Sequence, residues 1–205
     1  MIVKVCGMRD PDNIRAVAEA GADWMGFIFY PRSPRCFDRT SIPLPDAISR
    51  VGVFVNEKPE RILAKAGEFG LDYLQLHGKE PVDECRLLRE AGYPVIKAIS
   101  VSSAEDVLQA IPYEGEVDYF LFDTKCKGYG GSGRQFDWSV LESYQGETPF
   151  LLSGGISPGS ITELEQFRHP LCAGIDLNSG FETAPANKDE QLLKLFIGQF
   201  KSQFK

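Results

Sequence analysis

The stretch Val51-Gly52-Val53-Phe54-Val55 is apolar at every position, so neither face of a strand formed here would suit contact with water. Such strands are typical of a parallel sheet covered by helices on both faces. Similar apolar runs begin 22–30 residues apart, which is the length of one strand–helix unit. The runs are Ile2–Cys6, Met25–Tyr30, Val51–Val55, Tyr73–His77, Val95–Ser100, Tyr119–Asp123, Pro149–Ser153 and Ala173–Leu177.

The segments between these runs carry helical patterns. Asp10-Pro11 and Ser157-Pro158 each look like a helix N-cap followed by proline at the first helical position. Between the second and third runs, Pro31–Arg50 contains four prolines and predicts a short helix or a loop. Apolar residues at helical spacing predict further helices at Lys58–Phe69, Glu80–Ala91, Ser103–Ala110 and Lys188–Phe204.

This alternation of eight strands with helices favours an α/β fold, a closed (β/α)8 TIM barrel, for which 205 residues is a short chain. The alternative is an open doubly wound sheet, which would more often have fewer strands and a glycine-rich turn after the first one. No linker or low-complexity tract divides the sequence. We therefore expect residues 1–205 to form a single barrel domain.

Composition narrows the class of function. The net charge of −7 argues against a nucleic-acid partner, although it leaves room for a cationic pocket that binds a small anion. The five cysteines are widely spaced without a CxxC pair, and the two histidines lie far apart, which predicts neither a disulfide framework nor a metal site. No dinucleotide fingerprint or P-loop occurs, so we expect no cofactor.

The cellular location follows from what the sequence lacks. Free thiols are typical of a reducing compartment. The amino-terminal apolar run is too short for a signal peptide, and no apolar run approaches the roughly 18 residues of a membrane span. We therefore expect a cytoplasmic protein with no membrane partner.

Polar residues or glycines follow nearly every strand-like run. Active groups of parallel barrels lie at the carboxyl ends of the strands, so this pattern predicts a site at one mouth of the barrel. The residues are Cys6-Gly7, Arg32 and Arg35, Asn56, His77-Gly78, Ser100, Asp123, Ser153-Gly154-Gly155 and Asn178-Ser179-Gly180.

Two of these residues suggest proton transfer. Cys6 shares its side-chain parity with Lys4, and a nearby ammonium favours the thiolate form that serves as a base. The alternative for Cys6 is a small buried hydrophobic residue. Asp123 follows four apolar residues, and a desolvated carboxyl group that keeps its proton suits a general acid, whereas a loop cap is the alternative.

Several other features suit an anionic ligand. The turns after the seventh and eighth strands contain Gly154, Gly155, Ser179 and Gly180, at the place where barrels frequently bind phosphate through backbone N–H groups. Gly131 lies in a glycine-rich loop flanked by Lys125, Lys127 and Arg134, which could close over an anion. Ordinary structural turns and a plain loop are the alternatives.

Arginines and two further polar residues complete the candidate pocket. Arg32 and Arg35 flank Pro34, and a guanidinium can bind a planar carboxylate through two hydrogen bonds, although most loop arginines are simply solvated. His77 and Asp176 have the parity of pocket residues, with a structural role as the alternative. Taken together, these residues predict a cofactor-free isomerase that acts on a phosphorylated small molecule.

Eight motifs occur along the chain in a fixed order. They are Lys4-Val5-Cys6-Gly7, Ser33-Pro34-Arg35, Gly52-Val53-Phe54-Val55-Asn56, Gln75-Leu76-His77-Gly78, Phe122-Asp123, Gly130-Gly131-Ser132-Gly133 with Phe136-Asp137-Trp138, Ser153-Gly154-Gly155-Ile156 and Asp176-Leu177-Asn178-Ser179-Gly180-Phe181-Glu182. In this ordered set, which spans nearly the whole chain, the sequence resembles the phosphoribosylanthranilate isomerase family of tryptophan biosynthesis.

The resemblance implies an Amadori rearrangement of N-(5-phosphoribosyl)anthranilate to 1-(2-carboxyphenylamino)-1-deoxyribulose 5-phosphate. Asp123 would protonate the ribose ring oxygen, and Cys6 would take the C2 proton of the resulting Schiff base. Arg35 would hold the anthranilate carboxylate. Gly154, Gly155, Ser179 and Gly180 would bind the phosphate. The expected partner is this phosphoribosyl substrate, and the expected assembly is a monomer or a homodimer.

The chain departs from the family pattern at two positions, and two other functions are alternatives to this isomerisation. The family usually has Ser or Thr where this chain has Asn178, and Cys126 belongs to no family motif. A related phosphosugar isomerisation of histidine biosynthesis is a second candidate, but that barrel is normally longer and has an aspartate at the end of the first strand. A non-catalytic binder of phosphorylated ligands is a third, yet it would be expected to lack Cys6 or Asp123.

Overall fold

Eight parallel strands close into a barrel in a computed structural model that describes residues 1–45, 47–125 and 136–204. The strands follow one another around the barrel in sequence order, and β1 pairs with β8 to close it. This confirms the predicted TIM barrel and rules out the open sheet. The strands are β1 (Ile2–Cys6), β2 (Trp24–Ile28), β3 (Ser49–Phe54), β4 (Tyr73–Leu76), β5 (Val95–Val101), β6 (Tyr119–Thr124), β7 (Phe150–Leu152) and β8 (Cys172–Leu177).

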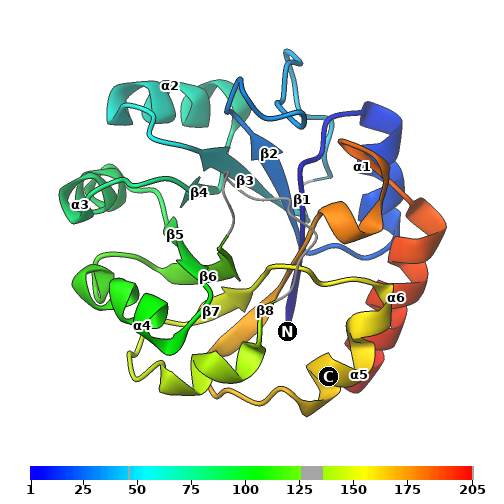
Figure 1. The fold of residues 1–205 in the computed structure, drawn as a ribbon. Coiled ribbons are helices and arrows are strands. Elements are labelled where there is room, and N and C mark those ends of the chain that lie inside the picture. Colours follow the sequence, from blue (N-terminus) through cyan, green and yellow to red (C-terminus); the bar gives the residue numbers. More distant parts are fainter. Residues whose placement is uncertain (46, 126–135, 205) are drawn as a thin grey trace.

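Helices surround this ring of strands (Figure 1). The predicted cap at Asp10 is confirmed, because its side chain accepts hydrogen bonds from the backbone N–H groups of Asp12 and Asn13 and Pro11 begins the helix. The α-helices are α1 (Pro11–Glu19), α2 (Pro59–Phe69), α3 (Val82–Glu90), α4 (Ala104–Val107), α5 (Ile161–Gln166) and α6 (Glu190–Gln203). None of the described helices is long and apolar enough to cross a membrane.

Two of the predicted helices are 3₁₀ helices over part of their length. The one after β5 ends at Val107 and continues as a 3₁₀ helix, η1 (Leu108–Tyr113), which contains Pro112. Proline has no N–H group and breaks the α-helical hydrogen-bond ladder, which accounts for the change. The helix after β7 begins as a 3₁₀ turn, η3 (Pro158–Ser160), before α5.

Between β2 and β3, where the prolines predicted a short helix or a loop, the described residues form no helix. The loop is nevertheless packed against the barrel. The Phe37 N–H donates to the carbonyl oxygen of Ile28 at 2.8 Å, and the Phe37 ring lies edge-on to Phe27 at a centroid distance of 5.2 Å. The buried Phe37 side chain thus covers the outer surface of β2 in place of a helix.

The interior of the barrel is apolar near the amino-terminal ends of the strands. Trp24 stacks on Tyr73 with ring centroids 4.2 Å apart and meets Tyr119 edge-on at 5.3 Å. These residues begin β2, β4 and β6, and alternate strands of a TIM barrel contribute side chains to the same interior layer. The polar side chains of the interior are therefore found toward the carboxyl ends.

One buried ion pair lies outside the barrel interior and supports the turn after β4. Lys97 of β5 places its Nζ atom 2.9 Å from Oε2 of Glu80 and donates to the carbonyl oxygens of Leu76 and Gly78. Glu80 also accepts hydrogen bonds from the N–H groups of Asn56 and Gly78. Both charged side chains are buried, so each depends on the other for compensation.

We expect Lys97→Met to lower the free energy of unfolding by about 3–5 kcal/mol, because it leaves the Glu80 carboxylate buried and uncompensated. The double variant Lys97→Met with Glu80→Gln should recover much of this loss. Urea denaturation measures both, with Lys65→Met as the control, since the Lys65–Glu68 pair is exposed. If Lys97→Met lowered the free energy of unfolding as little as Lys65→Met does, the Glu80 carboxylate would not depend on Lys97 for compensation.

Candidate active site

A pocket opens at the carboxyl ends of the strands, where the sequence predicted it. Arg32 is exposed and lies outside the pocket, so the structure separates it from Arg35. Gly131 and Cys126 lie outside the described residues. The predicted residues that line the pocket are Cys6, Arg35, His77, Asp123, Gly154, Gly155, Asp176, Ser179 and Gly180.

Cys6 ends β1 and is almost fully buried, with 4% of its surface exposed. Its strand neighbour Gly26 leaves room for the sulfur, because a Cβ atom on that glycine would lie 2.6 Å from the Cys6 Sγ. Burial raises the pKa of the Cys6 thiol, and the adjacent Lys4 offsets this only in part. Lys4 thus favours the thiolate as expected, but burial of the sulfur opposes it, and the protonation state of Cys6 in the free protein stays a prediction.

Lys4 pairs instead with Asp176 of β8. Its Nζ atom lies 2.7 Å from Asp176 Oδ1, and both side chains are buried. Burial alone would lower the pKa of Lys4, but the carboxylate of Asp176 raises it above its ordinary value. Asp176 thus lines the pocket as the partner of a buried cation.

Asp123 lies near the carboxyl end of β6 and is largely buried, with 13% of its side chain exposed. Its Oδ1 atom accepts a hydrogen bond from the backbone N–H of Thr124 at 2.9 Å and lies 3.5 Å from the Ser153 hydroxyl. Its Oδ2 atom lies 3.4 Å from Nε2 of His77. Neighbours on both oxygens fix the orientation of this carboxyl group.

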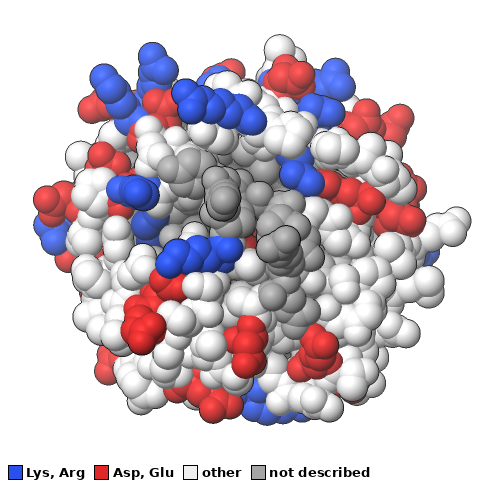
Figure 2. All heavy atoms as spheres, viewed as in Figure 1, with Lys and Arg blue, Asp and Glu red and all other residues white. Residues whose placement is uncertain are grey.

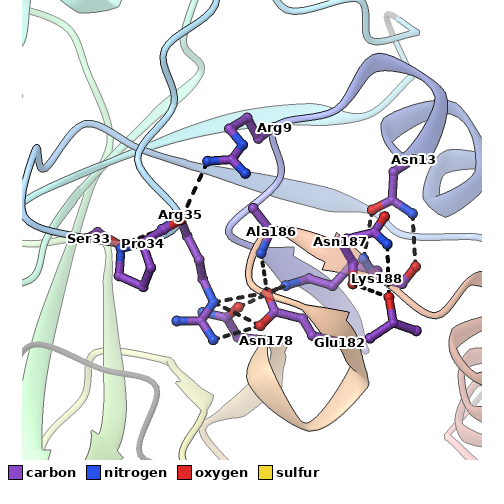
Figure 3. A network of polar contacts seen from close by, with 11 residues as sticks. Arg9, Asn13, Ser33, Pro34, Arg35, Asn178, Glu182, Ala186, Asn187 and Lys188 are labelled. Carbon is purple, nitrogen blue, oxygen red and sulfur yellow. Dashed lines mark hydrogen bonds and ion pairs between the residues drawn. The ribbon is translucent and has the colours of Figure 1, made fainter.

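Arg35 is held by a protein carboxylate (Figure 3). Its Nε and Nη2 atoms contact both carboxylate oxygens of Glu182 at 2.6–3.0 Å. Burial would raise the pKa of Glu182, but Arg35 and Lys188 together lower it. Because Glu182 occupies the Nε–Nη2 edge, a ligand carboxylate must approach Arg35 from the side of Nη1.

Lys188 completes this polar network. Its buried Nζ atom lies 2.6 Å from Glu182 and 2.8 Å from Oδ1 of Asn178 (Figure 3). The side chain of Asn13 in α1 binds both the N–H and the carbonyl oxygen of Lys188. The sequence placed Lys188 at the start of a helix, which is wrong: it belongs to a hairpin of β9 (Glu182–Ala184) and β10 (Asn187–Lys188), and α6 begins after the Asp189 cap.

The two turns predicted to bind phosphate pack closely against the backbone and side chains around them. Gly154 and Gly155 have positive φ values of 85° and 72°, a conformation that favours glycine. A Cβ atom on Gly154 would lie 2.3 Å from Oγ1 of Thr124, and one on Gly180 would lie 2.3 Å from the carbonyl oxygen of Ile156. Within the described part of the chain, the N–H groups of Gly154 and Gly155 donate to no other backbone group.

The surface charge around this mouth differs from the net charge of the chain. Figure 2 shows Lys and Arg side chains around the inner part of the viewed face, whereas its lower rim carries mostly Asp and Glu. Nearby cations attract anionic ligands even to a protein of net negative charge. The face therefore suits a ligand that carries a phosphate or a carboxylate.

Comparison with known proteins decides the family. The model of the N-(5'-phosphoribosyl)anthranilate isomerase family matches residues 3–199. The chain belongs to this family. It is therefore an enzyme, an isomerase built on a TIM barrel, and the resemblance seen in the ordered motifs is confirmed.

Individual relatives align with nearly the full length of the chain. The protein named N-(5'-phosphoribosyl)anthranilate isomerase from Phocaeicola vulgatus is 58% identical over 203 residues, covering 99% of each chain. A solved phosphoribosyl anthranilate isomerase from Thermotoga maritima is 39% identical, with a TM-score of 0.86 over 98% of this chain and 100% of that one. Another solved isomerase, in complex with reduced 1-(o-carboxyphenylamino)-1-deoxyribulose 5-phosphate, is 36% identical, with a TM-score of 0.83 and the same coverage.

We expect Cys6 to remain a thiol through neutral pH, because burial raises the pKa of its side chain. A pH titration of thiolate ultraviolet absorbance, taken as the difference between wild type and Cys6→Ser, should show ionisation above the ordinary range of a cysteine. Lys4→Met should move it higher still, because the opposing cation is lost. As a control, Cys36→Ser should leave this step unchanged. Ionisation of Cys6 near neutral pH would show that Lys4 outweighs burial after all.

Proposed function

We propose that this isomerase converts N-(5-phosphoribosyl)anthranilate to 1-(2-carboxyphenylamino)-1-deoxyribulose 5-phosphate by acid–base catalysis at the described pocket, as a step of tryptophan biosynthesis. One observation carries the proposal: Cys6 and Asp123, the two groups suited to move protons, line the same pocket as Arg35 and the glycine turns. The name of the family and the ligand of the solved relative support the choice of substrate.

In the proposed mechanism, Asp123 begins as the general acid. It gives its proton to the ring oxygen as the bond between that oxygen and C1 breaks, which leaves a protonated Schiff base between C1 and the anthranilate nitrogen. The thiolate of Cys6 then removes the proton from C2, and the resulting enol rearranges to the ketone. Each positioned proton transfer typically contributes about 10²–10⁴-fold to the rate.

A protonated Cys6 is compatible with this order of steps only if the substrate helps to ionise the thiol. Burial raises the pKa of this thiol, which favours its protonated form in the free protein. A cationic Schiff base opposite the sulfur favours the thiolate by direct attraction, so the base form appears when it is needed. The thiol proton passes to solvent when the thiolate forms, and the C2 proton then restores the thiol of Cys6. Isomerisation consumes no net proton, so the turnover ends when Asp123 regains a proton from solvent.

The remaining pocket residues bind the two ends of the substrate in this proposal. Arg35 holds the anthranilate carboxylate through the Nη1 side that Glu182 leaves open, and the backbone amides of Gly154, Gly155, Ser179 and Gly180 hold the phosphate. Gly131, which lies outside the described residues, stays a predicted pocket residue. A monomer or homodimer, a cytoplasmic location and the absence of a nucleic-acid partner stay predictions.

Turnover of phosphoribosylanthranilate, generated in situ and followed by the loss of its fluorescence, tests the acid and the base. We expect Cys6→Ser and Asp123→Asn each to lower kcat by about 10²–10⁴-fold, because each removes one positioned proton carrier. Circular dichroism checks that both variants fold. An inert wild type that still binds a product analogue would reject the isomerase mechanism in favour of a binding protein, and an active Cys6→Ser would reject Cys6 as the base.

Arg35→Lys tests carboxylate binding. We expect KM to rise about tenfold or more while kcat changes less, because lysine cannot offer the planar pair of donors that a carboxylate binds. Arg32→Lys is the matched control, since Arg32 lies two residues before Pro34 but is exposed outside the pocket. Steady-state kinetics of both variants decide the matter, and equal effects on KM would remove Arg35 from the proposed site.

A further inference from the structure

His77 lies between two polar side chains on the pocket wall. Gln75 of β4 and His77 directly after that strand point into the pocket, and the Gln75 Nε2 atom lies 2.8 Å from the His77 Nδ1 atom. On the other side of the ring, Nε2 lies 3.4 Å from Oδ2 of Asp123. Gln75 is 1% exposed, so water does not compete for its amide.

The Gln75 amide decides which nitrogen of the imidazole carries the proton. A neutral imidazole has one N–H donor and one bare acceptor nitrogen, and an amide nitrogen only donates. With the amide nitrogen at Nδ1, this atom must be the acceptor, and the proton lies on Nε2. The Nε2–H group then lies on the side of Asp123, with 3.4 Å between Nε2 and Oδ2.

The opposite amide orientation is less favourable. It would place the carbonyl oxygen at Nδ1 and leave the buried amide N–H groups without this acceptor. In the observed orientation the one unpaired atom of Gln75 among the described residues is the carbonyl Oε1. A carbonyl oxygen without a partner is found in buried positions somewhat more often than an N–H group without one.

We infer that Gln75 fixes the Nε2–H tautomer of His77 and that His77 is a positioning residue for Asp123. The Thr124 N–H donates to Oδ1 and the His77 Nε2 atom lies 3.4 Å from Oδ2, so each carboxyl oxygen has a neighbour that restrains its orientation. The N–H of His77 also faces the negative charge that Asp123 acquires when it gives up its proton, an arrangement that stabilises developing charge. The inference rests on the proposed function, in which Asp123 is the acid.

Nitrogen NMR tests the tautomer without reference to activity. The chain has two histidines, so the full-length protein labelled with ¹⁵N-histidine gives two sets of ring signals, which His169→Gln assigns. The signals of His169 supply an internal reference, because its Nδ1 accepts from the backbone N–H of Leu171 at 3.2 Å. We expect His77 to show a bare Nδ1 and a protonated Nε2. A protonated Nδ1 with a bare Nε2 would overturn the inference.

Two variants of Gln75 test its role. Gln75→Glu replaces the donor by a carboxylate that only accepts, so we expect the imidazole of His77 to acquire a proton on Nδ1. Gln75→Leu removes the donor at similar size and should leave a mixture of tautomers, which keeps the test available if the Glu variant does not fold. An unchanged His77 spectrum in the folded Leu variant would show that Gln75 does not set the tautomer.

Kinetics separate positioning from direct substrate contact. We expect Gln75→Leu to lower kcat about ten- to a hundredfold and to leave KM nearly unchanged. This loss is no larger than the roughly 10²–10⁴-fold that general acid catalysis contributes to the rate. His77→Gln keeps an N–H donor and should lose less than His77→Leu. A rise in KM alone would overturn the positioning role and assign His77 to the substrate. An inert wild type with the expected tautomer would reject the proposed function while leaving the assignment made by NMR in place.

Discussion

The ion pair between Lys4 and Asp176 sits at the seam that closes the barrel. The two residues are register partners on β1 and β8, and their charged atoms lie 2.7 Å apart with almost no exposure. A buried charge without a partner costs several kcal/mol, so a shift of either strand would leave two such charges uncompensated. The pair therefore strongly disfavours any other register between the first and last strands.

This register also places the reactive groups. Cys6 lies two residues beyond Lys4 and Asn178 lies two residues beyond Asp176, so both reach the rim of the barrel on the inner face. On the other side of Asp176, the Ser153 hydroxyl lies 3.5 Å from both Asp176 and Asp123. Asp123 of β6 and Cys6 of β1, the proposed acid and base, thus line one pocket together with these polar side chains.

The sequence predicted strands and helices correctly where the local pattern of apolar and polar residues alone determines them. All eight strands appear near their expected positions, because an apolar run bounded by polar turns needs only its own residues to be recognised. Their ends differ by one or two residues, since β-pairing with neighbours determines where a strand stops. The helix after β5 is shorter than predicted because Pro112 interrupts the ladder, and that signal was present in the sequence.

Long-range contacts could not be predicted in this way. Arg35 and Glu182 lie 147 positions apart, and no local pattern indicates that the carboxylate occupies one edge of the guanidinium. Lys188 looks like a residue on a helix until the hairpin of β9 and β10 buries it against Glu182. The balance of burial and charge at Cys6 likewise depends on how closely the barrel packs around the sulfur, which the neighbouring Lys4 in the sequence does not reveal.

The barrel interior therefore has an aromatic part near the amino-terminal ends of the strands and a polar part near their carboxyl ends. The aromatic contacts of Trp24, Tyr73 and Tyr119 fill the amino-terminal part and stabilise the fold without polar groups. The carboxyl-terminal part carries buried polar side chains that each need a partner, which lowers the stability gained per residue but fixes their positions. Because the two parts occupy different layers of the same strands, the proposed acid and base can lie among buried polar side chains near the mouth without replacing the aromatic contacts at the other end of the barrel.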